Sequence, residues 1–570
     1  MSGLHVTENK NKAAFIAAII LMVLAAFIQC YRTTSDLHWF YDTDFYRDMS
    51  YVQGALDGKF GKDPNYAGAY LWYNPMLSSI ETLIVKITGL PVNIVLARAG
   101  VYLNLLGPLA FVLMLTVLFD LRMALACLLS YLFLASGNIP GFDAATYSPW
   151  LYPVCFAQFI FYLNIILCYK AFSTQKYLWF VILGCAAGIG FLAHTAPTVL
   201  IILIMASVQT GNIAKALRSR DYQLFKKYIF QGLAAFIPFI IASLPLLFFI
   251  VGKYHLHFLN RMPFEYVDSI FDWHNFTVLI RENVSVSFLI SIVGFVWFYK
   301  NFKHVLIRKI ILSWFFISII MFIYSTIVAS ADRHFNIHLP GTVPSFHYFF
   351  YLKAVQSVFF GFGFIFLISP LVRWAEGFIS IKVNSLNDVL KANQLFIILV
   401  ILCSIIYFPF YQNRQDFVFF HAQNLAQENE KDKIEMYQYI VQNIPSDKVI
   451  LCEEGDPSLF PVMATARKMV SIGITYSNPY LDFERRETDR NNMILFLKTG
   501  QPFTAKQLFD NYQVSFVLLS NKELGNYKST SLLKQIIFKN NTYTMLTFDG
   551  LSLNSADREG SETVLSAETE

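Results

Sequence analysis

The chain has 570 residues, of which 55% are hydrophobic and only 15% are charged, with a net charge of +5. An ordinary globular protein carries about 25% charged residues, so this composition excludes a typical soluble protein. The apolar residues fall in blocks of roughly 15 to 25, the length that crosses a hydrocarbon core of about 30 Å. We therefore predict an α-helical polytopic membrane protein.

The charge divides the chain into two unlike parts. Residues 1–411 carry 28 Lys and Arg against 18 Asp and Glu, whereas residues 412–570 carry 16 against 21. We interpret residues 1–12 as a cytoplasmic N-terminus and residues 13–411 as a transmembrane domain. The acidic remainder is then a separate polar region.

About eleven apolar segments are predicted to cross the membrane. They begin near Ala13, Ala99, Met123, Leu151, Leu178, Ala196, Tyr228, Val284, Lys309, Leu352 and Leu395. Lys and Arg gather in alternate short loops, which the positive-inside rule places in the cytoplasm together with the N-terminus. Eleven crossings then put the C-terminal region outside, on the periplasmic, extracellular or lumenal face. The long first outer loop, about residues 31–98, lies on that same face.

A tight turn is predicted where two short segments must fit between two cytoplasmic loops. Lys176 and Lys215 both lie in loops that are rich in cations. The chain must therefore turn back between them, near residues 193–197. This places His194 at the outer face.

The C-terminal region, residues 412–550, is predicted to be an extracytoplasmic α/β domain. Helical spacing of apolar residues runs from Gln427 to Asn443, and a second helix is expected over 505–512. Residues 449–451 and 514–519 have the pattern of buried strands. Alternation of helices and strands favours a layered sheet. Residues 551–570 are rich in Ser and Glu without an aromatic residue, and we expect them to be disordered.

The first outer loop carries a pair of acids among aromatic residues. The run is Trp39-Phe40-Tyr41-Asp42-Thr43-Asp44-Phe45-Tyr46-Arg47-Asp48, just after the first apolar segment. Acids held beside bulky aromatics at a membrane face are costly unless they are solvated, paired or bound to a metal. The pair is therefore a candidate site, and the competing interpretation is a solvated loop.

Two kinds of chemistry suit this pair. Asp42 and Asp44 can together hold a divalent cation, Mg²⁺ or Mn²⁺, against a phosphate. Alternatively, one acid can act as a general base toward an acceptor hydroxyl while the other orients or tunes it. Both uses suit glycosyl transfer.

The loop resembles the first outer loop of the multipass GT-C glycosyltransferases. The resemblance is carried by Asp44-Phe45-Tyr46-Arg47-Asp48-Met49, by Gly54-Ala55-Leu56-Asp57-Gly58-Lys59-Phe60-Gly61 and by Asp63-Pro64-Asn65-Tyr66. Tyr73-Asn74-Pro75-Met76 is similar to the Tyr/Lys-Pro-Pro-Leu stretch of the protein mannosyltransferase and lipid A aminoarabinose transferase branches, with Asn74 in place of the first Pro. The Trp-Trp-Asp-Tyr-Gly motif of oligosaccharyltransferase catalytic subunits is absent from the sequence.

The resemblance implies inverting transfer of a sugar from a polyprenyl-phosphate carrier to a glycan, lipid or protein acceptor. Asp44 would deprotonate the acceptor, with Asp42 as its partner or as a metal ligand. The departing phosphate needs cations, for which Arg47, His194 and Arg333 are the candidates. The expected partners are the bilayer, the lipid-linked donor and the acceptor, without nucleic acid.

Two other functions remain open from the sequence. A transporter or flippase of lipid-linked sugars should carry ionisable residues within its spans, and the predicted spans have almost none at their centres. A non-catalytic membrane assembly factor would have no use for the Asp pair. The alternatives therefore predict different outcomes when Asp42 and Asp44 are changed.

Overall fold

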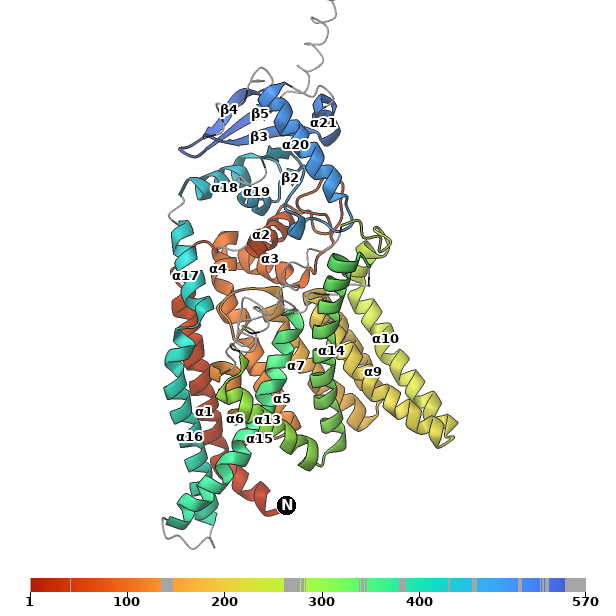
Figure 1. Ribbon diagram of the computed structural model, residues 1–570, viewed down its shortest axis with the longest axis vertical. Helices are drawn as coiled ribbons and strands as arrows, with labels where there is room; N and C mark the ends of the chain where they lie inside the picture. The colour runs from red at the N-terminus through yellow and green to blue at the C-terminus, as the bar shows by residue number, and fades with distance from the viewer. Residues whose placement is uncertain are drawn as a thin grey trace, which may run out of the picture. The chain divides into compact units, whose positions relative to one another are not determined.

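The structure is a computed structural model of the whole chain (Figure 1). It describes residues 2–40, 43–134, 147–260, 277, 281, 283–337, 339, 343, 346–378, 386–428, 431–453, 459–500, 505–522, 524, 527 and 533–548. The chain divides into two compact units. Unit 1 comprises residues 1–36, 97–245 and 264–422, and unit 2 comprises residues 37–96, 246–263 and 423–570.

Each of the eleven predicted apolar segments is helical. Eight helices among the described residues are long and apolar enough to span a membrane: 12–34, 92–118, 153–174, 195–218, 222–250, 305–324, 347–370 and 393–426. Three shorter apolar helices, 121–134, 177–193 and 286–301, account for the remaining predicted segments. The chain is thus a mainly helical integral membrane protein, as the sequence predicted.

The following helices belong wholly or mostly to unit 1. They are α1 (Ser2–Thr34), α5 (Leu106–Leu118), α6 (Leu121–Leu129) with a π-helical turn Ser130–Leu134, α7 (Pro153–Thr174), α8 (Tyr177–Ala193), α9 (Thr195–Arg218), α13 (Val286–Asn301), α14 (Val305–Phe335), α15 (Phe346–Phe378), α16 (Leu386–Gln412) and α17 (Gln415–Glu428). Helix α17 crosses the boundary between the units, as do α4 (Val92–Leu103) and α10 (Tyr222–Ile250). The first and last spans, α1 and α16, run side by side (Figure 1), and their Phe15 and Phe396 rings lie 6.4 Å apart.

The predicted turn at His194 is confirmed. Helix α8 ends at Ala193, and His194 has extended backbone geometry. Its ring accepts a hydrogen bond from the Ala196 backbone N–H, 3.2 Å away, and so caps α9. A side chain that caps the first turn satisfies a backbone donor that a helix start leaves without a partner.

Small residues allow α13 and α15 to pack closely. A Cβ atom on Gly294 would collide with the carbonyl oxygen of Phe359, and one on Gly363 would collide with that of Ile290. Helices in a membrane gain much of their association energy from such close backbone approach. The two glycines therefore set the spacing of this helix pair.

Gly294→Ala should destabilise the protein because the added methyl must push α13 away from α15. Overpacking of this kind typically costs about 1–3 kcal/mol. Thermal unfolding of the detergent-purified protein measures it. Gly232→Ala is the matched control, since a Cβ at Gly232 on α10 meets nothing within 4 Å. Equal melting temperatures for the two variants would contradict this account of the packing.

In unit 2 the first outer loop forms helices α2 (Thr43–Leu56) and α3 (Met76–Thr88). Helix α2 ends in a glycine turn: Gly58 has φ +74°, and the Lys59 N–H donates to the Gly54 carbonyl. A left-handed glycine after a helix satisfies its last carbonyls at little steric cost. Gly89, with φ +69°, ends α3 in the same way.

The C-terminal domain contains a five-stranded sheet in the order β2-β1-β3-β5-β4. Strands β2, β1 and β3 are parallel, while β5 and β4 run antiparallel, with Val517 opposite Leu546. The strands are β1 (Val449–Cys452), β2 (Lys468–Met469), β3 (Val514–Ser520), β4 (Leu533–Lys539) and β5 (Tyr543–Phe548). The helices are α18 (Lys431–Asn443), α19 (Leu459–Ala464), α20 (Phe483–Thr499) and α21 (Ala505–Tyr512), with a 3₁₀ turn Ile474–Tyr476.

Apolar residues from strands and helices form the core of this domain. Leu451 and Val517 of the sheet pack with Leu497 of α20 and Phe509 of α21. The layered α/β prediction is therefore borne out, although β2, β4, β5 and α20 were not predicted. The predicted disordered tail, residues 551–570, lies outside the described residues.

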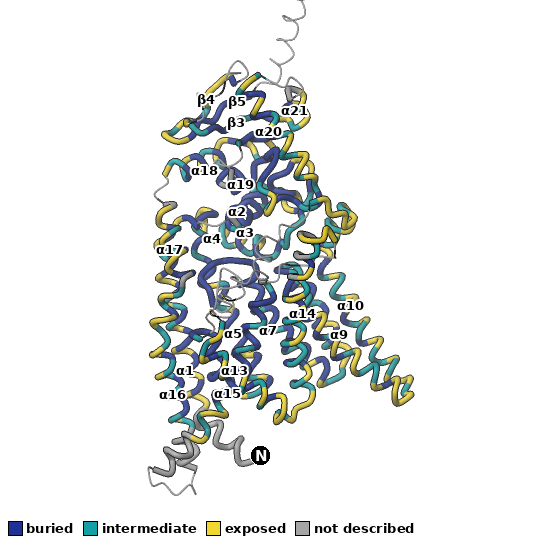
Figure 2. The backbone as a smooth tube through the Cα atoms, in the orientation of Figure 1, coloured by how far each residue is buried: buried dark blue, intermediate teal, exposed yellow. Residues whose placement is uncertain are grey.

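The compact units do not divide at the predicted boundary between residues 411 and 412. The division comes after residue 422, within helix α17, so that residues 415–422 of this helix belong to unit 1. Polar contacts within unit 1 explain this. Arg414 pairs with the buried Asp416 at 2.6 Å, and the His421 ring contacts the Thr33 carbonyl at the end of α1, 2.7 Å away. Figure 2 shows the distribution of buried residues along the chain.

Candidate active site

A buried ion cluster lies on the first two turns of α2. Asp44, Arg47 and Asp48 occupy positions i, i+3 and i+4, which share one face of a helix. Arg47 Nε and Nη2 donate to the two oxygens of Asp48 at 2.8 and 3.1 Å, and Nη1 donates to Asp44 Oδ1 at 2.9 Å. One guanidinium thus holds two carboxylates, and the Asp48 contact is the bidentate geometry that arginine favours.

The three side chains differ in exposure. Arg47 and Asp48 are 9% and 8% exposed, whereas Asp44 is 26% exposed. Asp44 is therefore the accessible edge of the cluster. A reacting hydroxyl arriving from solvent would meet Asp44 rather than Asp48.

Two tyrosines flank the guanidinium. The Arg47 Cζ atom lies 4.1 Å from the centre of the Tyr73 ring and 6.0 Å from that of Tyr476. Tyr73 follows α2 in the first outer loop, while Tyr476 belongs to the C-terminal domain. A planar cation over aromatic rings is favourable, so both segments help to fix Arg47.

Burial and ion pairing shift the pKa values of this cluster in opposite directions. Burial raises the pKa of Asp48 to about 6, although Arg47 and its hydrogen bonds lower it. Burial disfavours the charged form of Arg47, but Asp44 and Asp48 outweigh it and raise the Arg47 pKa above its ordinary value. Arg47 therefore stays charged at any physiological pH.

A third acid, Glu81 on α3, is fully buried nearby. Neither carboxyl oxygen hydrogen-bonds to any described residue. Burial raises the Glu81 pKa well above its ordinary value, the charge of Asp48 adds to the effect, and Arg47 opposes it. An isolated ionised carboxylate would be very costly here, so burial favours the neutral form of Glu81.

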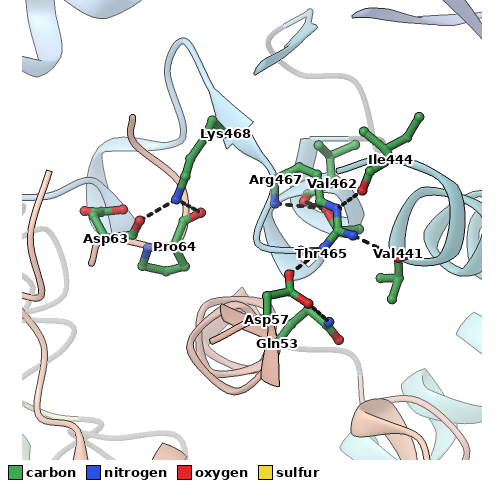
Figure 3. A network of polar contacts seen from close by, with 10 residues as sticks. All are labelled: Gln53, Asp57, Asp63, Pro64, Val441, Ile444, Val462, Thr465, Arg467 and Lys468. Atoms are coloured by element: carbon green, nitrogen blue, oxygen red, sulfur yellow. Dashed lines mark hydrogen bonds and ion pairs between the residues drawn. The ribbon is translucent and has the colours of Figure 1, made fainter. Parts of the chain in front are cut away.

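The C-terminal domain is joined to the first outer loop by buried cations (Figure 3). Arg467 Nη1 contacts Asp57 Oδ2 at 3.0 Å, and the same guanidinium donates to the carbonyls of Ile444 and Val441. Lys468 Nζ donates to the carbonyls of Asp63 and Pro64 at 2.7 and 2.9 Å. Burial lowers the Lys468 pKa to about 8, although Asp63 raises it.

Asp63 adds a second connection. Its Oδ1 accepts from the backbone N–H groups of Asn65 and Tyr66, and its Oδ2 accepts from the side chain of Asn478. Tyr66 also hydrogen-bonds Ser477 at 2.9 Å. The first outer loop and the C-terminal domain therefore form one compact unit, as expected for two polar regions on the same face.

The predicted phosphate-binding residues are only partly described. Arg47 is engaged by Asp44 and Asp48 as above. His194 is buried in unit 1, where its ring stacks on His347 at 4.8 Å. The side chain of Arg333 lies outside the described residues, as does Asp42.

The described residues near Asp44 supply only part of a binding site for a divalent cation. Asp44 offers a partly exposed carboxylate, but one of its oxygens already accepts from Arg47. Within the described part of the chain, no group of three or more His, Cys, Asp or Glu side chains is placed to hold a metal ion. If a cation binds here, Asp42 and Asp44 would hold it, and it would supply positive charge for a phosphate.

Sequence reasoning did not select Asp48, Tyr73, Glu81 or Tyr476. Asp48 was visible as the i+4 neighbour of Asp44 once a helix was expected there. Glu81, in an apolar stretch, is the kind of buried acid that the helical pattern could have indicated. The sequence offers no signal for Tyr476, because it lies some 400 residues from Arg47 in the chain.

Comparison with known proteins identifies the fold. No protein-family model and no curated protein matches the sequence. The structure is similar to ArnT from Cupriavidus metallidurans bound to undecaprenyl phosphate, with a TM-score of 0.54, 12% identity and coverage of 93% of this chain and 97% of that one. For ArnT from Cupriavidus metallidurans in the apo state, the TM-score is 0.52 and the identity is 12%. That match covers 95% of this chain and 99% of the other.

The structure is also similar to the archaeal oligosaccharyltransferase AglB from Archaeoglobus fulgidus, in complex with an inhibitory peptide and a dolichol-phosphate. The TM-score is 0.52, the identity 13%, and the match covers 90% of this chain and 70% of that one. The chain therefore has the fold of ArnT and AglB, in agreement with the fold that the first outer loop predicted.

Proposed function

From the GT-C fold of this chain, we propose that it transfers a sugar from a polyprenyl-phosphate carrier to an acceptor on the non-cytoplasmic face. The observation that carries the proposal is the ion cluster on α2, in which Asp44 is the partly exposed acid. The ligands of ArnT and AglB, undecaprenyl phosphate and dolichol-phosphate, support the choice of donor. The acceptor is a glycolipid, a polysaccharide or a protein.

In the proposed reaction Asp44 acts as general base. It takes the proton of the acceptor hydroxyl while the oxygen attacks the anomeric carbon, which inverts that centre. The bond between the anomeric carbon and the phosphate oxygen breaks, and polyprenyl phosphate leaves with the electron pair. Arg47 and Asp48 hold Asp44 in place, so the base is positioned before the substrates arrive.

Cations must offset the charge that develops on the departing phosphate. The choice of His194 and Arg333 for this role stays a prediction from the sequence. Arg47 already donates three hydrogen bonds to Asp44 and Asp48, and its contact with the phosphate stays a prediction. Asp42 is assigned as the acid that tunes Asp44 or ligates a metal.

Exhaustive chelation tests the metal role of Asp42 and Asp44. If they hold Mg²⁺ or Mn²⁺, chelation should abolish sugar transfer and either cation should restore it. The purified protein in detergent, dialysed against chelator, provides the measurement. Unchanged activity would remove the metal role and leave Asp42 as a hydrogen-bonding partner of the site.

Topology is a second test, because the mechanism needs the lipid-linked sugar and both polar regions on one face. Reporter fusions near Gly58 and near Ser520 should both report a non-cytoplasmic location. A fusion near Lys215 is the control and should report the cytoplasm. A cytoplasmic signal at Ser520 would show that a crossing has been miscounted.

Identification of the bound lipid decides between the candidate functions. Mass spectrometry of lipids that copurify with the protein should show a polyprenyl-phosphate sugar, and added acceptor should receive that sugar. A transporter or flippase would bind the lipid without consuming it. An assembly factor would bind none.

A further inference from the structure

The turn that follows α2, at the opposite end from Asp44, packs on the end of α10. Asp44 and Leu56 are twelve residues apart on α2, which corresponds to about 18 Å along a helix. The chain then turns through Gly58 and Gly61 into a short two-stranded bridge between Lys62 and Tyr70. This turn is distinct from the candidate active site.

The contact with α10 is close and specific. Gly61 has φ +87°, and a Cβ atom there would lie 2.9 Å from the Phe249 ring. The Tyr70 ring stacks on Phe249 with centroids 6.0 Å apart. The Tyr254 hydroxyl donates to the Tyr70 carbonyl and accepts from its N–H, both at 2.7 Å. The turn is therefore fastened to the end of the helix.

Cations and exposed aromatics surround this contact. Lys62 Nζ lies 4.4 Å from the centre of the Tyr70 ring, and Lys253 Nζ lies 5.3 Å from the same ring. Both lysines are exposed. Phe60 is 59% exposed and Phe248 is 55% exposed. The ammonium groups of both lysines thus contact the ring of Tyr70, close to two solvent-accessible phenylalanines.

Part of this surface is the last turn of a candidate membrane span. Helix α10 is among the candidate spans, and few of its residues are buried (Figure 2). Its exposed side chains include Phe236, Ile237, Ile241 and Leu244. The cations Lys226 and Lys227 near its start place that end in the cytoplasm by the positive-inside rule. Phe248 and Lys253 then lie at the other interface.

We propose that Phe60, Lys62, Phe248 and Lys253, grouped around Tyr70, form a lipid-binding surface in the outer leaflet. Aromatic rings favour the headgroup level of a bilayer, and lysines there attract anionic lipid phosphates. The ligand is the phosphate of an ordinary bilayer phospholipid. Binding would hold the end of α2 at a fixed depth and so set the height of Asp44 above the hydrocarbon.

Spin labelling tests the insertion directly. The label is placed by Phe60→Cys in full-length protein that also carries Cys185→Ala and Cys403→Ala, which remove the two partly exposed native cysteines. In phosphatidylcholine vesicles the label should be more accessible to oxygen than to a water-soluble nickel complex. Ile536→Cys, at an exposed apolar residue of β4, is the control and should show the reverse. Equal nickel accessibility at the two positions would overturn the proposal.

The lysines are tested by adding phosphatidylglycerol to the vesicles. The label at position 60 should then move deeper into the bilayer. The Lys62→Gln/Lys253→Gln double variant should lose this response. Each lysine removed should lower the preference for anionic lipid roughly fivefold. Lys522→Gln/Lys539→Gln, at exposed lysines of the C-terminal domain, should keep it. An unchanged response in the Lys62/Lys253 variant would overturn the assignment of these lysines.

The source of the phosphate is settled in the same assay. The vesicles contain no polyprenyl phosphate. If the ligand is an ordinary phospholipid, insertion of the label and its response to phosphatidylglycerol should be complete in these vesicles. If either appears only after undecaprenyl phosphate is added, the surface serves the donor and the proposal fails. None of these readouts depends on sugar transfer.

Discussion

Asp44→Asn should slow sugar transfer at least about a hundredfold while leaving the protein folded and able to bind a polyprenyl-phosphate sugar. Asn is nearly isosteric with Asp, and Arg47 remains paired with Asp48. Only proton abstraction is removed, and general-base catalysis typically contributes 10²–10⁴-fold, or about 3–5 kcal/mol at the barrier. Transfer rates and lipid binding are measured on the same purified sample.

The matched control is Asp510→Asn, at an exposed acid of α21. It should transfer at the wild-type rate. A loss confined to Asp42→Asn would move the base by two residues and keep the mechanism. Full activity in Asp44→Asn, in Asp42→Asn and in the double variant would contradict the transferase proposal. It would favour the transporter or assembly-factor alternatives.

Arg47→Met should destabilise unit 2 by about 3–5 kcal/mol, because it leaves the buried Asp48 carboxylate without its partner. Arg47 and Asp48 are both under 10% exposed, so water cannot replace the lost contacts. Limited proteolysis of the purified protein, followed at Arg and Lys sites of the C-terminal domain, measures the opening of this unit.

The double variant Arg47→Met/Asp48→Asn separates charge from packing. Replacing both members of a buried ion pair is often close to neutral, so much of the lost stability should return. Arg485→Met is the control, because Arg485 is 78% exposed and its ion pair with Asp489 is weak at 3.9 Å. If Arg47→Met is as stable as Arg485→Met, the ion cluster on α2 does not stabilise unit 2.

The same cluster gives unit 2 a distinctive pH dependence. The Asp48 pKa is about 6 in the folded protein, against an ordinary value of 3.8, chiefly because of burial. The folded state therefore binds more protons than the unfolded state between these values. The stability that Asp48 contributes is complete below pH 3.8 and is lost as the pH rises through 6. Asp48→Asn should flatten this slope, and an unchanged slope would contradict the assignment.

The local patterns of the sequence predicted much of the fold. All eleven apolar segments are helices because an apolar run must form its backbone hydrogen bonds internally in a bilayer. The strand 514–519 and the helix 505–512 appear almost as predicted, since both have strong local periodicity. The turn at His194 followed from charge alone.

Short or weakly patterned elements escaped prediction. Strand β2 has only two residues, Lys468 and Met469, and owes its pairing to the neighbouring β1. Helix α20 is polar along most of its length, so its hydrophobic pattern is weak. Its Asp482 cap and Gly500 stop are nevertheless visible in the sequence once the helix is known.

The sequence by itself determined that this protein is a polytopic membrane protein, and it singled out the acids of the first outer loop as the site that we propose. Composition and helix-length apolar runs depend only on neighbouring residues. Only the tertiary structure decided that Arg47 binds Asp44 and Asp48, that Tyr476 reaches Arg47, and that Glu81 is buried beside them. The contact between Tyr476 and Arg47 joins segments far apart in the chain, whereas Arg47, Asp44 and Asp48 are neighbours on one helix. Burial, which no local pattern encodes, raises the pKa of Asp48 and of Glu81.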